Sequence, residues 1–438
     1  MTKLRLFLTL LTLTFVLTVG YFASLIARGY RFDTKSLTLK PRGLFVITSS
    51  PDGAQVLVNN ELESATNATI PLPPGEYNIQ LKKEGYWSWE KHITIKEEEV
   101  TKIDAYLFPS APSLSAITFT GAVNPILSPD GTKIVYGVPN TPTSNKEKVG
   151  IWVMDIADLP LGFSREPKKI TDLPPENAGL RWSPDQRQIL VASTNGQTTL
   201  SLPNGFYTID SSTLTAQTAL KSLTPQQLSE LTTTWKQEED KKQKDNLNKI
   251  PEKLKSLFKA EKITLSPDKT KVLYTATDNF TIPENILPQL PGSSTQQQER
   301  SVIKGRTYVY DLKEDRNFLV FDQNYTTQDE LFAEASASAT PKLQTKAGIA
   351  PPKTIKQNPP AGGQTTIKWF PTSNHLLIAQ DGKISIKDYD NTNVQTIYSG
   401  PYQSPFAIPF PNTSRVLILT NLGQGESSLA NLYTISLK

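Results

Sequence analysis

The stretch Leu127-Ser128-Pro129-Asp130-Gly131, followed by the apolar triplet Ile134-Val135-Tyr136, decides the fold because variants of it recur along the chain. The other copies are centred on prolines, at Pro184, Pro267, Pro371 and Pro411. In every copy the fifth, sixth and seventh residues after the proline are apolar, although only 37% of the chain is hydrophobic. Proline presets φ for a turn and Asp accepts a hydrogen bond within it, so each copy predicts a turn that leads into a buried strand.

A second landmark follows each apolar triplet and predicts a further strand. It reads aromatic, any residue, apolar, Asp at Trp152–Asp155, Tyr207–Asp210 and Tyr308–Asp311, with looser versions at 384–388 and 433–436. A strand, a turn, a buried strand and an alternating strand make up most of a four-stranded propeller blade. We therefore expect a mainly β protein with a propeller of five or six blades over residues 112–438. The strand Ser115–Phe119 is placed to complete the last blade and close the ring.

The spacing of the five prolines indicates large insertions. Consecutive prolines lie 55, 83, 104 and 40 residues apart, whereas a bare blade takes about 40–45 residues. A degenerate sixth blade has room within residues 278–306 or 322–364. The repeats resemble those of TolB-type and WD-like propellers over roughly residues 112–438. We expect their turn aspartates to be structural, because they recur in the early blades and lack the Ser-x-Asp-x-Gly-x-Thr-Trp pattern of the sialidase Asp-box.

Residues 42–109 show short alternating strands separated by Pro-Gly turns, which predicts a small β-sandwich. Three landmarks resemble the PEGA domain: Pro51-Asp52-Gly53-Ala54, with Asp in place of the usual Glu, then Leu72–Tyr77 and Lys83-Glu84-Gly85-Tyr86. The resemblance implies an extracytoplasmic sandwich of envelope and surface proteins. That family is generally without catalysis, so it carries no catalytic residues to transfer.

The aromatic cluster Tyr86, Trp87 and Trp89 has two interpretations. As a ligand-binding platform it would stack on sugars or peptides, because aromatic faces serve polar ligands that have apolar sides. As a structural feature, its rings cap the sandwich core, which is the more common fate of part-buried Trp and Tyr.

Leu6–Ala27 contains no charged residue and is long enough to cross a bilayer. We expect a short tail (residues 1–5), a transmembrane anchor (6–28) and a linker (29–41); cleavage as a signal peptide is the alternative, although this apolar run is longer than usual. Orientation is contested. Cations are more numerous after the segment than before it, which favours a cytoplasmic body, whereas the PEGA resemblance favours an extracytoplasmic one, which we adopt.

Residues 223–260 interrupt the β pattern and predict a helical insertion. Thr224-Pro225-Gln226-Gln227 is a helix start, with Thr as the N-cap and Gln in the capping box. Leu228, Leu231 and Trp235 follow at helical spacing, and Leu254, Leu257 and Phe258 form a second apolar stripe, so two short helices are expected. The stripes either pack on the propeller rim or dock a partner. Residues 333–364 carry few apolar anchors and predict a flexible insertion.

Composition narrows the function. The 438 residues contain no Cys and two His, and their net charge is +4. Thiolate sites are thereby excluded, and nucleic acid is a poor candidate partner. We expect no cofactor and no metal, because no phosphate loop or metalloprotease motif is present. The sequence favours a membrane-anchored, non-catalytic envelope or surface protein whose propeller binds a protein, peptide or glycan. In this interpretation the sandwich is a stalk or a wall-contacting unit. The alternatives are a carboxylate-based hydrolase in the propeller funnel and an assembly scaffold that docks partners through the helical insertion.

Overall fold

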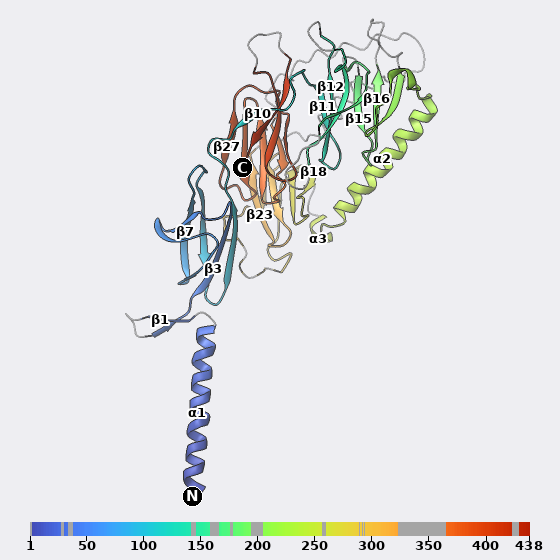
Figure 1. The fold of residues 1–438 in the computed structure, drawn as a ribbon. Helices are drawn as coiled ribbons and strands as arrows, with labels where there is room; N and C mark the ends of the chain where they lie inside the picture. Colours follow the sequence, from blue (N-terminus) through green and yellow to red (C-terminus); the bar gives the residue numbers. More distant parts are fainter. Residues whose placement is uncertain are drawn as a thin grey trace. The chain divides into compact units, whose positions relative to one another are not determined.

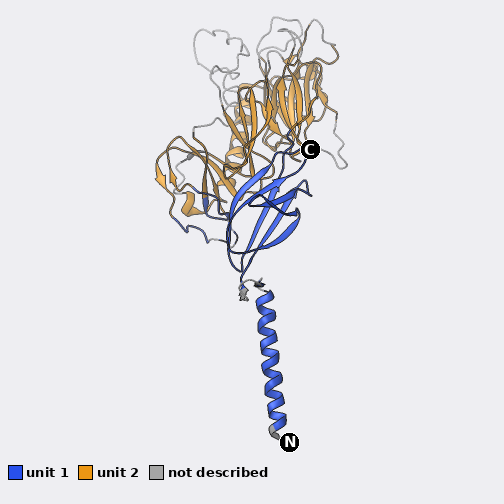
Figure 2. Cartoon of the chain, turned by 90° about the vertical axis from the view of Figure 1, so that its left-hand side faces the viewer, with its two compact units in different colours: residues 1–110, 284–298, 313–316 blue, residues 111–283, 299–312, 317–438 orange. Residues whose placement is uncertain are grey.

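The structure, a computed structural model, describes residues 2–27, 30–33, 38–141, 146–157, 166–175, 178–193, 205–255, 260–288, 290, 292, 294–322, 365–422 and 429–438. The chain divides into two compact units (Figure 2). Unit 1 comprises residues 1–110, 284–298 and 313–316, and unit 2 comprises 111–283, 299–312 and 317–438. The predicted insertion 333–364 lies outside the described residues.

The N-terminal apolar stretch forms helix α1 (Thr2–Ala27) (Figure 1). Its segment Leu4–Ala27 is 24 residues long, which suits a membrane-spanning helix and a signal sequence alike. Threonine hydroxyls along it donate to carbonyls one turn back, as Thr14 does to Leu10 and Thr18 does to Thr14, both at 2.8 Å. These bonds satisfy polar side chains without water, as a helix in lipid requires. A hairpin of β1 (Arg31–Asp33) and β2 (Thr38–Lys40) comes next.

Residues 43–106 fold into the predicted sandwich of two sheets. One sheet has the order β6 (Ala68–Leu72), β3 (Gly43–Ser50), β9 (Val100–Tyr106), and the other has β5 (Glu61–Ala65), β4 (Gln55–Val58), β7 (Gly75–Lys82), β8 (Trp89–Ile95). Alternate residues of β3 are buried, and Phe45 and Ile47 join Val56, Leu81 and Trp89 in the core. Strands β5 and β6 were not predicted from the sequence, and β5 is almost wholly exposed and has no apolar alternation.

Among the described residues, unit 2 contains five sheets of three or four strands, numbered here as blades 1 to 5. Blade 1 is β11 (Val123–Leu127), β12 (Lys133–Val138), β13 (Gly150–Asp155), β14 (Lys168–Thr171), and blade 2 is β15 (Ala178–Trp182), β16 (Gln188–Ser193), β17 (Gly205–Asp210). Blade 3 is β18 (Ala260–Leu265), β19 (Lys271–Ala276), β22 (Thr307–Asp311), β23 (Arg316–Phe321), and blade 4 is β24 (Thr366–Trp369), β25 (His375–Gln380), β26 (Lys383–Asp388), β27 (Gln395–Ser399). Blade 5 is β10 (Leu114–Ala116), β30 (Asn431–Ser436), β29 (Arg415–Thr420), β28 (Ala407–Pro409).

The first strand of the propeller sequence completes the last blade. In β10, Leu114 pairs with Ile435 and Ala116 with Tyr433 of β30, which confirms that the segment after residue 112 contributes to the C-terminal blade. Residues 278–306, one of the two places with room for a sixth blade, instead hold a two-stranded ribbon of β20 (Phe280–Thr281) and β21 (Ser301–Val302). Most of the other place, 323–364, lies outside the described residues.

Apolar side chains pack neighbouring blades against each other. One cluster joins blades 1 and 2 through Val135, Ile151, Ile189, Val191 and Tyr207, and others join blade 1 to blade 5 and blade 3 to blade 4. The motif tryptophans add a repeated hydrogen bond. Trp182 Nε1 donates to Ile126 O of blade 1 at 3.1 Å, and Trp369 Nε1 donates to Thr264 O of blade 3 at 3.1 Å. Both carbonyls lie two residues before the motif serine, so the same contact is used at two interfaces.

The chain between blades 2 and 3 forms α2 (Pro225–Leu247), then the short α3 (Glu252–Lys255) (Figure 1). The expected start is confirmed, since Thr224 and Gln227 make both bonds of a capping box. The first helix is longer than expected. The Lys-, Glu- and Gln-rich stretch after Trp235 continues it, because these residues have good helix propensity even without apolar spacing.

Candidate functional site

The carboxylates of the turn aspartates accept hydrogen bonds from residues of their own turns. Asp130 Oδ1 accepts from Ser128 Oγ at 2.6 Å and from Thr132 N at 3.0 Å, while Oδ2 accepts from Thr132 Oγ1 at 2.6 Å. Partial burial raises the pKa of Asp130, but these hydrogen bonds outweigh it and hold the pKa below its ordinary value. Asp185 and Asp268 accept equivalent bonds from Ser183 and Ser266. A carboxylate so occupied is suited to fixing a turn rather than to proton transfer.

A second repeated feature places the first residue of each second strand opposite the last residue of the third. The cross-strand partners in blades 1 to 5 are Lys133 and Asp155, Gln188 and Asp210, Lys271 and Asp311, His375 and Asp388, and Arg415 and Ser436. The sequence contained this pattern, because each pair joins the turn motif to the aromatic-x-apolar-Asp motif. Opposite charges facing each other across a ladder stabilise the pairing.

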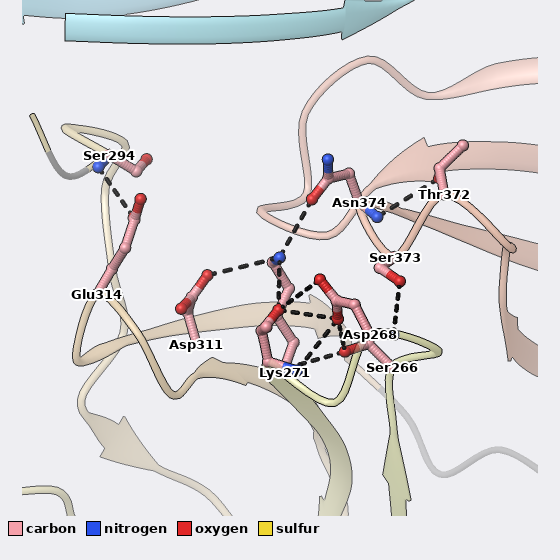
Figure 3. Close-up of polar contacts among 10 residues, drawn as sticks. Ser266, Asp268, Lys271, Ser294, Asp311, Glu314, Thr372, Ser373 and Asn374 are labelled. Carbon is pink, nitrogen blue, oxygen red and sulfur yellow. Dashed lines mark hydrogen bonds and ion pairs between the residues drawn. The ribbon is translucent and has the colours of Figure 1, made fainter.

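In blade 3 the pair is buried and reaches into blade 4 (Figure 3). Lys271 Nζ lies 3.7 Å from Asp311 Oδ2, donates to Asn374 Oδ1 at 3.1 Å and lies 4.6 Å from the centre of the Tyr389 ring. Beside it, the Asp268 amide donates to Ser373 Oγ of blade 4 at 3.0 Å. These polar contacts supplement the apolar packing between the two blades.

In blade 4 the pair forms a Thr-His-Asp chain. His375, 4% exposed, has Nδ1 2.6 Å from Thr372 Oγ1 and Nε2 3.3 Å from Asp388 Oδ1. Nucleophilic triads use the same three groups. Here the His-Asp pair occupies the position that Lys271 and Asp311 occupy in blade 3, and Asp388 also accepts from Thr392 and Asn393. The repeat therefore favours a structural role.

The other histidine is a surface residue of the sandwich. His92 Nδ1 lies 2.7 Å from Asn78 Oδ1 and Nε2 lies 3.5 Å from Glu76, with both side chains of that pair exposed. Within the described part of the chain, no group of three or more His, Asp and Glu side chains is placed to hold a metal ion.

Lys387 on β26 is a buried cation that sequence reasoning missed. Its Nζ donates to Val320 O of blade 3 and to Asn391 Oδ1, the latter at 2.8 Å. Burial lowers its pKa to about 8. The sequence offered little signal, since a Lys in an alternating strand is normally placed on the solvent face.

The predicted aromatic platform is divided by burial. Trp89 is 1% exposed and belongs to the sandwich core, and Tyr86 is half-buried against that core. Trp87 is 41% exposed, and its amide donates to Phe108 O at 2.9 Å. One ring of the three thus remains at the surface. Whether it binds a ligand stays a prediction.

An open cavity of about 600 Å³ lies at this end of the sandwich. Its lining is polar and comprises Gly53, Gln55, Lys82, Lys83, Glu84 and Ser88. Ser88 directly follows Trp87 in the chain, and Lys83 Nζ is tied to Asp52 O at 2.8 Å. The lining thus combines two cations, one carboxylate and hydrogen-bonding side chains, and whether it takes a ligand stays a prediction.

The predicted docking stripe of α2 faces blade 2. Leu228 and Leu231 are half-buried, and Trp235 is 5% exposed. The Arg181 guanidinium of β15 lies 5.9 Å from the centre of the Trp235 ring and donates to Glu239 at 3.0 and 3.1 Å. Lys242 Nζ donates to Pro184 O at 2.6 Å. Partner docking by this stripe stays a prediction. The opposite face, with Gln237, Lys241 and Lys244, is exposed.

The geometry defines a mainly β chain that joins a small sandwich to a set of propeller blades, with an apolar N-terminal helix. Residues 42–110 match the PEGA domain, which confirms the resemblance drawn from the Pro-Asp-Gly-Ala and Gly-Tyr landmarks. No curated protein matches the chain.

Solved structures similar to the chain are propeller proteins. They include a putative TolB from Agrobacterium tumefaciens (10% identity, covering 79% of this chain and 81% of that one, TM-score 0.22) and TolB from Acinetobacter baumannii (11%, 82% and 59%, 0.20). A third is the β-propeller domain of the Trilobed protease from Pyrococcus furiosus (15%, 90% and 96%, 0.19). At these TM-scores the likenesses carry no argument, and the propeller assignment rests on the chain's own sheets.

Proposed function

We propose that the protein is a membrane-anchored, non-catalytic envelope or surface protein whose propeller binds a protein, peptide or glycan. The observation that carries this proposal is that the acidic side chains of the propeller motifs bond to other groups of the fold. The turn carboxylates accept hydrogen bonds within their own turns, as in Asp130, Asp185 and Asp268. Two further pairs join neighbouring strands, Lys271 with Asp311 and His375 with Asp388. A carboxylate-based hydrolase needs two carboxylates held free on either side of a substrate.

Membrane attachment is supported by α1, whose charge-free run Leu6–Ala27 is long enough to span a bilayer. The match to the PEGA domain supports an envelope location, with the body outside the cytoplasm. Protease treatment of intact cells tests this orientation. Degradation of residues beyond the anchor is expected, and complete protection of the body would overturn the proposed location.

For the sandwich we propose contact with the cell wall, through the polar cavity and Trp87. Co-sedimentation of the full chain in detergent with purified peptidoglycan tests this. Trp87→Ala and Lys83→Ala are expected to lower retention. Leu62→Ala is the control, since Leu62 is 64% exposed on β5 but does not line the cavity. Equal retention of all four proteins would reject the wall-contacting role.

The scaffold alternative is favoured by one feature, the long exposed face of α2. Because Trp235 is buried, deletion of 223–260 would also uncover blade 2, so it is a poor test. Substituting Lys241 and Lys244 by Glu changes the outward face and leaves Trp235 packed. A scaffold predicts loss of specific cross-links from α2 to one partner in membranes, and unchanged cross-links argue against it.

A further inference from the structure

A segment that follows β20 in the sequence belongs to the compact unit of the sandwich. Residues 284–298, called the strap here, lie between β20 and β21 in the chain, yet they group with unit 1 together with residues 313–316 (Figure 2). The chain therefore enters unit 1 three times. The strap has no strand or helix pattern in its sequence, so this grouping could not be predicted from it.

The strap satisfies the open edge of the sandwich. In the sheet order β5-β4-β7-β8, β8 is an edge strand, so one side of its backbone lacks a strand partner. The Thr94 amide of β8 donates to Thr295 Oγ1 at 3.1 Å, and Gln296 Nε2 donates to His92 O two residues earlier on the same strand. Groups two residues apart on a strand point the same way, and the strap covers both.

A second contact lies at the start of β9. The Gly292 amide donates to Glu99 Oε1 at 2.7 Å. Gly292 has φ +73°, and a Cβ at this position would lie 2.4 Å from Val100 O and 3.5 Å from Val100 C. The obstacle is backbone, which cannot move aside as a flexible side chain can. Only glycine therefore permits this approach.

The other side of the strap is held by the turn between β22 and β23. The Ser294 amide donates to Glu314 Oε2 at 2.9 Å, as Figure 3 shows, and Arg316 donates to Gln296 O at 2.5 Å. The described strap residues thus bond to the sandwich edge and to residues 313–316, which directly continue strands of blade 3.

We propose that the outer edge of β8 and the start of β9 form an intramolecular docking surface whose partner is the strap of the same chain. Docking protects the sandwich edge and couples its local opening to the strap. The edge of the sandwich is then completed by residues distant in the sequence, since Thr94 bonds to Thr295 about 200 positions later.

Amide hydrogen exchange of the full chain in detergent tests the proposal. Gly292→Ala is expected to speed exchange of the Thr94 amide roughly tenfold, the scale set by losing a hydrogen bond and its neighbours. Gly305→Ala is the matched control, because Gly305 has φ +80° with open space around its Cβ position. It shares the backbone strain without the clash.

A second pair of variants keeps the backbone intact. Thr295→Val removes the acceptor of the Thr94 amide, and Glu99→Gln weakens the acceptor of the Gly292 amide. Each is expected to speed exchange at its own partner amide. If the Thr94 amide exchanges at the wild-type rate in both Gly292→Ala and Thr295→Val, the strap is not docked and the proposal is wrong. The proposal is also wrong if the control Gly305→Ala speeds exchange of the Thr94 amide as much as Gly292→Ala does. A concentration-dependent dimer in Gly292→Ala alone would show the uncovered edge pairing with a second copy, which supports the docking surface.

Discussion

Blades 1 and 3 carry the same motif but use it differently. Lys133 faces Asp155 in blade 1 as Lys271 faces Asp311 in blade 3. The blade 1 pair is half-buried, whereas Lys271 and Asp311 are 6% and 3% exposed. The difference arises from blade 4, which supplies Asn374 and the Tyr389 ring around Lys271. The same cross-strand pairing is thus half-buried in one blade and part of an interblade lock in another.

The comparison teaches that the energetic weight of a repeat position is set by its neighbours. An ion pair near solvent contributes about 0–1 kcal/mol. A buried charge that loses its partner costs about 3–5 kcal/mol, because the remaining ion is unsolvated. The following predictions break or sharpen this contrast.

The largest effect is expected from Lys271→Met. It leaves Asp311 buried without its cation, so the free energy of unfolding should fall by about 3–5 kcal/mol. Lys133→Met should lower it by about 0–1 kcal/mol. Urea unfolding of the full chain in detergent, followed by Trp fluorescence, measures both. The double variant Lys271→Met, Asp311→Leu should recover much of the loss. Equal effects of the two single variants would remove the contrast between blades 1 and 3.

Lys387→Met tests a buried cation through pH. The pKa of Lys387 is about 8 in the folded protein and 10.5 ordinarily. Between these values the unfolded chain binds more protons, so this group makes wild-type stability rise with pH. The rise should total about 3 kcal/mol, at about 1.4 kcal/mol per pH unit.

The variant lacks that rise. From pH 8 to 10.5 the stability of wild type relative to Lys387→Met should therefore increase, while Lys383→Met, which changes an exposed residue on the same strand, should track wild type. Parallel pH profiles for wild type and Lys387→Met would contradict the effect of burial on Lys387.

Much of the propeller could be predicted because its signals are local. The Pro-centred turn, the apolar triplet after it and the Thr224 cap each lie within a few residues, and the structure has a turn, a buried strand and a capping box there. Periodicity and turn chemistry are properties of short segments. The recurrence of the motif also predicted that its aspartates are structural.

What sequence could not supply is long-range burial. Trp87 and Trp89 are two residues apart and look alike in sequence, but one is 41% exposed and the other 1%. Lys387 is buried by Val320 of another blade, and the strap reaches the sandwich from the middle of blade 3. The burial of each of these residues depends on contacts with segments far away in the sequence, and no short-range pattern indicates such contacts.

The turn aspartates should erase the contrast between blades. Asp130→Ala and Asp268→Ala each remove a carboxylate whose hydrogen bonds lie within its own turn, so both should cost about 1–2 kcal/mol. The pKa of Asp130 and that of Asp268 are lowered in the folded protein. The stability that these carboxylates contribute is therefore present above about pH 4 and is lost as the pH falls below it. Urea titrations at pH 7 and pH 3 measure it. A much larger loss for Asp268→Ala would show that the Asp268 carboxylate, and not only its amide, supports the contact between blades 3 and 4.

The smallest effect is expected where the motif is incomplete. In blade 5, Arg415 faces Ser436, so the cation lacks the cross-strand carboxylate present in blades 1 and 3. Ser436→Asp supplies it at a half-buried position. The pair should add about 0.2–1 kcal/mol to the free energy of unfolding, and 1 M NaCl should reduce the gain, since salt screens pairs that reach solvent. A gain of several kcal/mol that survives high salt would mean that blade 5 shields this position as blade 4 shields Lys271, and the distinction between surface pair and buried lock would then need another cause than burial.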